Sequence, residues 1–159
     1  MRLVGFVSFL QEPLNEFFAK VRPESGRAFD PEGEQEYLTD IAGNFRHFWV
    51  MMDDDQEIIG SIAIRDLKFD EKYKEVLHRN CGEIKCFYLL KEYHGQGYGK
   101  EMMRFAIDQG RSFGYNWLYL DSIASKSEAA IAIYKQFGFE EITRYNDNEH
   151  ADVFMRLKL

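Results

Sequence analysis

The sequence predicts a single α+β domain over residues 1–159. The run Glu83–Leu90 is rich in aromatic and branched residues, as buried strands are, and a glycine-rich loop and a helix-like run over 101–107 follow it directly. Near the end, Glu141–Tyr145 and Asp152–Lys158 alternate in polarity and predict a closing hairpin. The length suits one domain with a substantial core, and no repeat or linker divides it.

The first 41 residues predict a strand and two helices. Leu3–Phe9 is apolar enough for a strand. Pro13 fits the first turn of a helix, and Pro23 is expected to end it. A polar loop with three turn-forming residues follows, and 35–41 suits a short second helix.

A hairpin is expected next, from His47–Met52 and Glu57–Leu67. Its acidic turn, Asp53–Asp55, lacks the alternating spacing and terminal glutamate of a calcium loop, which favours a solvated turn. The charged segment Lys68–Asn80 is expected to cross the surface.

Two further helices and a strand are expected after the glycine-rich loop. The first helix buries Met102, Phe105 and Ala106 and ends near Gly114. Trp117–Asp121 is the next strand.

The last helix carries signals at both ends. Ser125 and Glu128 have the spacing of a capping box, which predicts the helix start. Gly138 suits the position after its end, with Phe139 as the apolar partner of a Schellman turn.

Composition excludes some functions. The formal net charge of −7 argues against nucleic acid as a partner, because proteins neutralise phosphates with Lys and Arg. Cys81 and Cys86 do not have zinc-site spacing, and a reducing cytoplasm is the simplest interpretation. The apolar start, 1–10, lacks a small-residue cleavage site, and no run is long enough to span a bilayer.

The loop His94–Lys100 alternates glycine with larger residues and leads straight into a helix. Such a loop presents backbone N–H groups at a positive helix end, where a phosphate binds well. A P-loop would need Ser or Thr at 101, where Glu stands. A dinucleotide fingerprint would need Gly at 100 or 102, where Lys and Met stand. A glycine turn without a ligand remains the alternative.

A second block makes the pattern recognisable. The loop reads His94-x-x-Gly97-x-Gly99, and the segment 127–139 reads SEAAIAIYKQFGF. Together they resemble the GNAT superfamily of acetyl-CoA-dependent N-acetyltransferases, whose two patterns are Q/R-x-x-G-x-G/A and N-x-x-A-x-x-L-Y-x-x-x-G-F. Two positions depart from these patterns: His94 replaces the usual Gln or Arg, and Ser127 replaces the usual Asn. The resemblance is strong over 82–139.

The resemblance implies a mixed, mostly antiparallel sheet flanked by helices on both faces, with a splayed central strand pair that admits acetyl-CoA as cosubstrate. It implies backbone contacts from Phe87–Leu89 to the pantetheine arm, with the Leu89 N–H polarising the thioester carbonyl. No metal is required, and homodimers are common in the family. The cofactor-binding residues expected on this basis are Phe87, Tyr88, Leu89, Gly95, Gln96, Gly97, Tyr98, Gly99, Lys100 and Ser127.

Glu83 is the candidate general base. It lies fourteen positions before Gly97, where the histone acetyltransferase members of the superfamily carry a base. Strand alternation places it on one face with Lys85, Phe87 and Leu89. The alternative is a glutamate that only forms an ion pair with Lys85 or a neighbouring strand, while a water or another carboxylate acts as base.

Tyr134 stands at the family's tyrosine, which protonates the departing thiolate; alternatively it is an ordinary core residue. Cys86 is expected on the strand face opposite Glu83, as a packing residue rather than a nucleophile. His78 and His150 either line the acceptor site or lie on the surface.

The sequence thus predicts an N-acetyltransferase that moves acetyl from acetyl-CoA to a primary amine by direct attack. The alternative is a non-catalytic acyl-CoA-binding module of the same fold. The net charge of −7 favours a small cationic amine over an acidic peptide, with no nucleic-acid or membrane partner.

Overall fold

The protein contains one seven-stranded mixed sheet in the order β1-β2-β3-β4-β5-β7-β6. A computed structural model describes residues 1–159. All neighbouring strands are antiparallel except β4 and β5. The elements are β1 (Arg2–Gly5), η1 (Ser8–Leu10), α1 (Gln11–Glu24), η2 (Glu36–Thr39), α2 (Ile41–Asn44), β2 (His47–Met52), β3 (Ile58–Leu67), η3 (Glu71–Tyr73), β4 (Cys81–Leu89), η4 (Lys91–Tyr93), α3 (Tyr98–Ser112), β5 (Trp117–Ser122), α4 (Glu128–Gln136), β6 (Glu140–Ile142) and β7 (Val153–Lys158).

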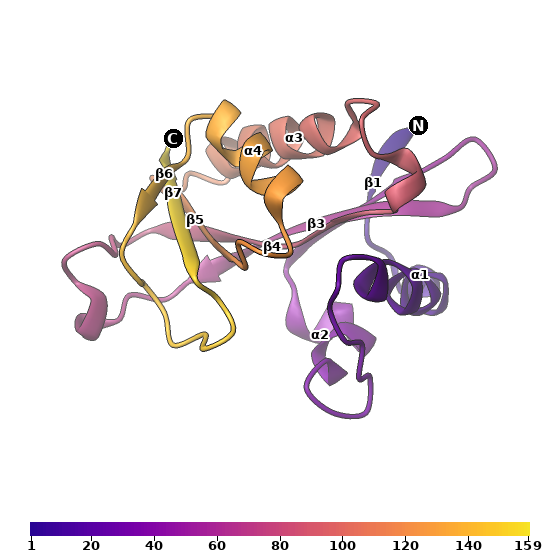
Figure 1. Ribbon diagram of the computed structural model, residues 1–159, viewed down its shortest axis with the longest axis horizontal. Helices are drawn as coiled ribbons and strands as arrows, with labels where there is room; N and C mark the ends of the chain where they lie inside the picture. Colours follow the sequence, from indigo (N-terminus) through magenta and orange to yellow (C-terminus); the bar gives the residue numbers. More distant parts are fainter.

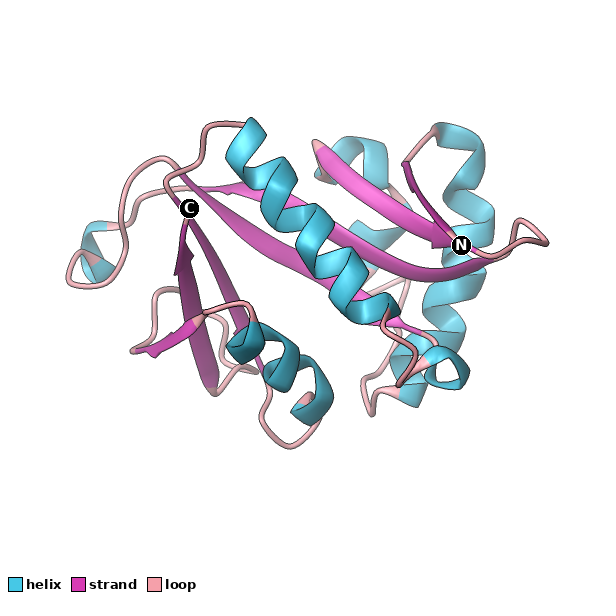
Figure 2. Ribbon diagram, turned by 90° about the horizontal axis from the view of Figure 1, so that it is seen from above, coloured by secondary structure: helices cyan, strands magenta, loops and turns pink.

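Helices cover both faces of the sheet, as the sequence predicts. In Figure 1, α1 and α2 lie on one side of the sheet and α3 and α4 on the other. Figure 2 shows α3 crossing over the long central strands, while β5, β6 and β7 fan away from them. The larger apolar core fills both layers around β2, β3 and β4, and a smaller core lies under β5 and β7. No helix is both long and apolar enough to cross a membrane.

The parallel pair at the centre of the sheet separates early. β4 and β5 pair only over Cys81–Glu83 and Trp117–Tyr119. Beyond Glu83, β4 has a ladder partner on one side only, which is β3. The predicted splayed pair is therefore present, and one backbone edge of β4 is open.

A bulge in β4 changes which side chains share a face. Cys86 has a φ of +54°, and the register with β3 slips by one residue there. Residues directly opposite each other point to the same face, so the pairs Ser61–Tyr88 and Ala63–Lys85 put Tyr88 with Lys85. The prediction that Phe87 and Leu89 share the Glu83 face is wrong, because the extra residue moves Tyr88 there instead and leaves Phe87 and Leu89 on the other face.

The N-terminal elements are shorter or longer than predicted. β1 ends at Gly5, and a 3₁₀ turn replaces the rest of the expected strand. α1 continues one residue past Pro23 and ends in a Schellman motif, with Arg27 N–H donating to Arg22 C=O at 2.9 Å. Gly26 takes the left-handed φ of +74° that this motif needs. The expected second helix is two short pieces, η2 and α2, separated at Asp40.

The ends of α4 give one wrong and one confirmed prediction. The helix starts at Glu128 after Ser127, so Ser125 does not cap it and the capping box is absent. At the other end, Phe139 N–H donates to Tyr134 C=O and Gly138 N–H to Lys135 C=O, both at 3.1 Å, which is the predicted Schellman turn.

Candidate active site

The glycine-rich loop presents a row of free backbone donors. The N–H groups of residues 95–100 make no hydrogen bond within the protein, because Glu101 is the first residue whose N–H finds a helical acceptor, Gly97 C=O at 3.0 Å. They lie at the N-terminus of α3, where the helix dipole adds positive potential. This arrangement suits a pyrophosphate, and it rests on the backbone rather than on side chains.

Two glycines shape this loop for different reasons. Gly97 has a φ of +90° as the N-cap of α3, a conformation that glycine adopts without strain. A Cβ on Gly99 would lie 2.9 Å from Cδ1 of Ile133, so glycine there lets α4 pack closely against α3. His94, which replaces the family's Gln or Arg, contacts the Leu89 carbonyl at 2.9 Å through Nε2. Its ring therefore fixes the loop to the end of β4.

The open edge of β4 faces the separation from β5. Leu90 N–H donates to Ile59 C=O of β3 at 2.9 Å, so the amide of Leu89, one residue earlier, points to the opposite edge. Phe87 lies on the α3 and α4 side, since its ring is 5.8 Å from that of Tyr134 and 3.7 Å from a Cβ built on Gly99. The edge thus offers an amide donor beside an apolar wall.

Tyr134 lies in that wall with a free hydroxyl. Its ring packs between Phe87 and Phe139, at 5.8 and 5.9 Å, and the residue is 5% exposed. The hydroxyl has no hydrogen-bond partner within the protein, yet no fully buried side-chain oxygen lacks one, so the hydroxyl reaches solvent. Burial raises the pKa of Tyr134, and the charge of nearby Arg27 opposes the increase. The hydroxyl therefore keeps its proton at neutral pH and can donate it.

Glu83 lies on the opposite face of β4 and is only 1% exposed. Its Oε2 accepts from the Tyr145 hydroxyl at 2.6 Å, and its Oε1 accepts from Arg65 Nε at 3.0 Å. Lys85 Nζ is 3.9 Å from Oε1. Glu83 does pair with Lys85 and with Arg65 of a neighbouring strand, and its role as a general base stays a prediction. Both carboxylate oxygens of Glu83 are therefore already engaged by side chains.

A second carboxylate extends this polar network. Asp121 of β5 accepts from Asn146 Nδ2 at 2.7 Å and lies 3.5 Å from Lys85 Nζ. Asn146 also contacts Glu83, at 3.4 Å. The loop between β6 and β7 therefore links carboxylates from the two diverging strands.

The hydroxyl of Ser127 already has a hydrogen-bond partner within the protein. Its Oγ accepts from Arg27 Nη2 at 2.6 Å, which joins the loop after α1 to the start of α4. The prediction that Ser127 contacts pantetheine is not tested by this contact, which still leaves the hydroxyl proton free to donate.

Cys86 lies on the same side as Glu83, contrary to the sequence expectation. Its thiol is near enough to Lys85, Arg65 and Arg22 for their charges to act on it, whereas simple alternation would have put it opposite. Burial nonetheless raises its pKa to about 12, so the thiolate that a nucleophile needs is disfavoured.

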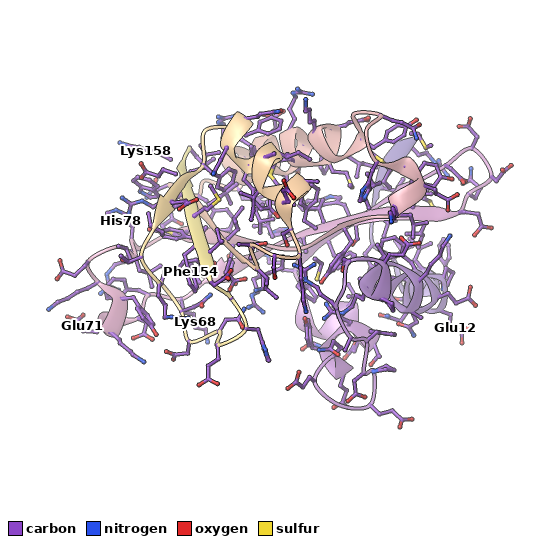
Figure 3. The ribbon with its side chains drawn as sticks, viewed as in Figure 1. Glu12, Lys68, Glu71, His78, Phe154 and Lys158 are labelled. Carbon is purple, nitrogen blue, oxygen red and sulfur yellow. The ribbon has the colours of Figure 1, made fainter.

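The two histidines left open by the sequence occupy different places. His78 stacks on Trp117 at 5.0 Å, and Figure 3 places it at the end of the molecule away from Glu12 of α1. His150 is exposed, and its Nε2 lies 3.9 Å from Glu34 in the loop between α1 and η2. Of the two, His150 is the one that approaches the loop between α1 and η2.

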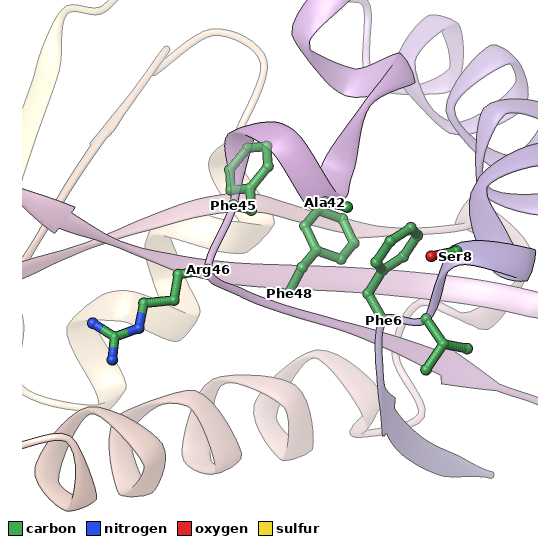
Figure 4. A pocket seen from close by; sticks show the side chains of 7 residues that line it. Phe6, Ser8, Ala42, Phe45, Arg46 and Phe48 are labelled. Carbon is green, nitrogen blue, oxygen red and sulfur yellow. The ribbon is translucent and has the colours of Figure 1, made fainter.

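A surface hollow lies on the other side of β3 from these groups. Figure 4 shows Phe6, Phe45 and Phe48 gathered there between β1, α2 and β2, with Arg46 at its edge. Its walls are mainly apolar and carry no carboxylate, thiol or histidine. The acid–base groups therefore cluster at the splay and not in this hollow.

Sequence reasoning missed Arg65, Tyr145, Asn146 and Arg27. Arg65 becomes the neighbour of Glu83 only through the β3–β4 register. Tyr145 and Asn146 lie in a loop without regular structure, and Arg27 follows a glycine turn. None carries a spacing signal, because each reaches the site through tertiary contacts.

Comparison with known proteins agrees with this geometry. The family model described as the acetyltransferase (GNAT) family matches residues 14–139. The chain belongs to this family. The GNAT fold is equally clear in solved structures: an acetyltransferase of the GNAT family from Staphylococcus aureus Mu50 superposes with a TM-score of 0.81, at 21% identity over 99% of this chain and 98% of that one. YhbS from Escherichia coli, solved in complex with CoA, gives 0.71 at 16% identity over 99% of this chain and 80% of that one.

Among curated GNAT relatives, the uncharacterized N-acetyltransferase YjgM of Escherichia coli K12 is 30% identical over 95 residues, 60% of this chain and 52% of the relative. An uncharacterized N-acetyltransferase of Dictyostelium discoideum is 33% identical over 79 residues, 48% of this chain. The chain spans about half or less of the length of these curated relatives.

Proposed function

We propose that this chain is an acetyl-CoA-dependent N-acetyltransferase whose acceptor is a small primary amine. One observation carries the proposal: the open edge of β4 has both the free backbone amides of residues 95–100 and the free hydroxyl of Tyr134 beside it. The CoA found in the related YhbS structure supports the choice of cosubstrate. A non-catalytic acyl-CoA-binding module would not need a carboxylate held as firmly as Glu83.

The proposed cofactor site uses groups on the α3 and α4 side of β4. The amides of Gly95–Lys100 hold the pyrophosphate, and the backbone of Phe87–Leu89 aligns the pantetheine arm, with Ser127 as a further donor. The Leu89 N–H donates to the thioester oxygen, which bears negative charge once the amine has attacked.

Proton transfers are assigned to opposite faces of β4. A free amine has a pKa near ~10 and must lose a proton before it attacks. Glu83 accepts that proton through a bridging water. The amine nitrogen then bonds to the carbonyl carbon and loses its second proton to water. The carbon–sulfur bond breaks, and Tyr134 gives its proton to the leaving thiolate and regains one from solvent. The overall negative charge of −7 attracts the ammonium form of the acceptor before it is deprotonated.

Ligand-dependent thermal stability tests the cofactor assignment. Acetyl-CoA at about 100 times its Kd stabilises the native protein by about 2.7 kcal/mol, so the Tm rises. Gly97→Val abolishes this rise, because a side chain there blocks close approach to the amides. Gly114→Val is the matched control: that glycine also has a positive φ (+82°) and open space around it, but it follows the opposite end of α3.

Both variants lose basal stability through backbone strain, and only Gly97→Val loses the response to ligand. A wild-type Tm that millimolar acetyl-CoA does not raise refutes the proposed function. Equal ligand responses in the two variants refute the role of the loop. Release of CoA thiol with a panel of primary amines then separates an enzyme from a binding module.

A further inference from the structure

Arg22 of α1 is a buried cation without an ionic partner. The residue is 9% exposed, and its guanidinium donates from Nε to Ala28 C=O at 2.8 Å and from Nη1 to the Tyr88 hydroxyl at 2.5 Å. No carboxylate lies within ion-pair distance of it. Arginine stays protonated in proteins, and an unmatched buried charge is costly. Because the protein keeps this unmatched charge at a cost in stability, we look for a ligand whose negative charge offsets it.

One nitrogen of this guanidinium remains available. Nη2 of Arg22 has no acceptor within the protein, while no fully buried side-chain nitrogen in the structure lacks a hydrogen-bond partner. Nη2 therefore reaches solvent. The hydrogen bonds to Ala28 and Tyr88 hold the Arg22 guanidinium in place and leave its free nitrogen facing solvent. A guanidinium fixed in this way is a preorganised site for an anion.

A second unpaired arginine adds to this charge. The Schellman turn after α1 brings Arg27 back beside Arg22, and Arg27 donates to Ser127 Oγ without meeting a carboxylate. Both guanidinium groups act on Tyr88: burial raises the pKa of its hydroxyl to about 12, and the two charges offset part of that increase. Arg22 therefore bonds this hydroxyl, and Arg27 adds positive charge nearby without bonding to it.

Tyr88, which Arg22 bonds, lies on the Glu83 face of β4, whereas Arg27 bonds Ser127 at the start of α4. Tyr88 shares that face with Lys85, whose charge is already matched by Glu83 and Asp121. Arg65 is likewise matched by Glu83. The ion pairs on this face therefore leave Arg22 and Arg27 without a carboxylate partner, although the whole chain carries −7.

We propose that Arg22, assisted by Arg27 and the Tyr88 hydroxyl, binds a carboxylate on the acceptor, so that the acceptor is a small amino acid rather than a simple amine. This inference rests on the proposed acetyl transfer and narrows its substrate class. The carboxylate takes Nη2, and the amine lies toward Glu83 and the thioester. A purely cationic amine would leave Arg22 unmatched and be repelled by it.

Acetylation of matched acceptors tests the inference. The probes are L-amino acids, their carboxamides, and the primary amines with the same side chain but no carboxyl group. We expect kcat/KM for the preferred amino acid to exceed that of its carboxamide by roughly 10- to 100-fold, the range of one charge-assisted hydrogen bond. Equal values for acid and carboxamide overturn the inference. So does acetylation of simple amines alone.

Variants separate the carboxylate site from the cofactor site. Arg22→Gln should lower kcat/KM for the amino acid by roughly 10- to 100-fold, mostly through KM, and leave the carboxamide nearly unchanged. Arg27 is more exposed, so Arg27→Gln should lower kcat/KM for the amino acid by a smaller factor and again leave the carboxamide nearly unchanged. This variant replaces Arg22→Gln in the test if Arg22→Gln does not fold. Arg46→Gln is the control, because Arg46 also lacks an ion pair but lies beside the hollow of Figure 4.

The stabilisation by acetyl-CoA distinguishes the two possible failures. If both variants lose that stabilisation and slow every acceptor equally, the arginines bind the cosubstrate and the inference is wrong, while the acetyltransferase function stands. If wild-type protein is stabilised by acetyl-CoA but acetylates no amino acid in the panel, the inference is again wrong. A wild type that acetyl-CoA does not stabilise contradicts the proposed function itself.

Discussion

The two faces of β4 differ in the chemical groups that they offer to a ligand. Toward α3 and α4, the strand offers the edge amide of Leu89 and the aromatic wall of Phe87 and Tyr134, with no charged side chain among them. Toward α1 and α2, it offers Glu83 and Lys85 within a network of ion pairs. One face therefore depends on the backbone, and the other depends on side chains.

This difference suggests which parts of the site are common to the family and which set the specificity of one member. Backbone amides suit a pyrophosphate whatever side chains surround them, so short glycine patterns suffice to encode a cofactor site. Charged side chains discriminate among acceptors, since an unmatched charge costs more than a lost contact. Substitutions on the two faces should therefore have different kinetic signatures.

The largest effect is expected from Tyr134→Phe. Removing the general acid should lower kcat by a factor of about 10²–10⁴, with the affinity for acetyl-CoA little changed. Because the hydroxyl makes no hydrogen bond in the protein, the Tm should hardly move. Tyr119→Phe is the opposite control: it loses the bond donated to Val76 C=O and the bond accepted from His78 N–H, which costs about 1–3 kcal/mol, and it leaves kcat unchanged. An unchanged kcat in Tyr134→Phe, measured by thiol release, refutes the assignment.

A smaller, pH-dependent effect is expected from Glu83→Gln. Below the pKa of the acceptor amine, where the amine is protonated, kcat/KM should fall by roughly 10- to 100-fold, and the loss should shrink as pH approaches ~10. Glu140→Gln is the control, because it removes another carboxylate paired with an arginine, Arg156 at 3.1 Å, away from the splay. A wild-type pH–rate profile in Glu83→Gln would show that another group is the base.

The smallest effect is expected from Ser61→Ala, which tests the bulge that separates the two faces. Ser61 is fully buried, and its Oγ donates to Cys86 C=O at 2.7 Å, inside the bulge. Losing this donor should lower the free energy of unfolding by roughly 1–3 kcal/mol and change the KM of both substrates modestly. Ser112→Ala removes an exposed hydroxyl bonded to Gln109 C=O and should stay within ~0.5 kcal/mol, as chemical denaturation will check. A stable Ser61→Ala protein would mean that the backbone alone holds the bulge.

Local patterns made much of the fold predictable. The hairpin of β2 and β3, the glycine loop before α3 and the Schellman turn at Gly138 all follow from signals within a few residues. The ends of α1 and α4 were harder to predict, because neighbouring residues there give conflicting signals for where a helix starts or stops. Pro23 removes a donor but still fits the last turn of α1, and Ser125 has the right spacing without being the cap.

The arrangement on the Glu83 face of β4 was not predictable, because tertiary packing assembles it. Strand alternation assumes an uninterrupted strand, and the left-handed residue at Cys86 moves Tyr88 to the Glu83 face. Likewise, the overall charge of −7 describes the whole surface and not the position of Arg22. The assigned roles of Glu83, Tyr134 and the cofactor-binding residues stay predictions until the variants are measured.

The turn that ends α1 has a consequence for how new specificities arise. Arg22 and Arg27 lie at the end of α1 and in the turn after it, whereas the amide loop spans 95–100, so the proposed carboxylate and pyrophosphate contacts are encoded in separate stretches of the gene. Exchange of one short cassette, by recombination or by loop grafting in the laboratory, can alter the acceptor while the cofactor site is inherited intact.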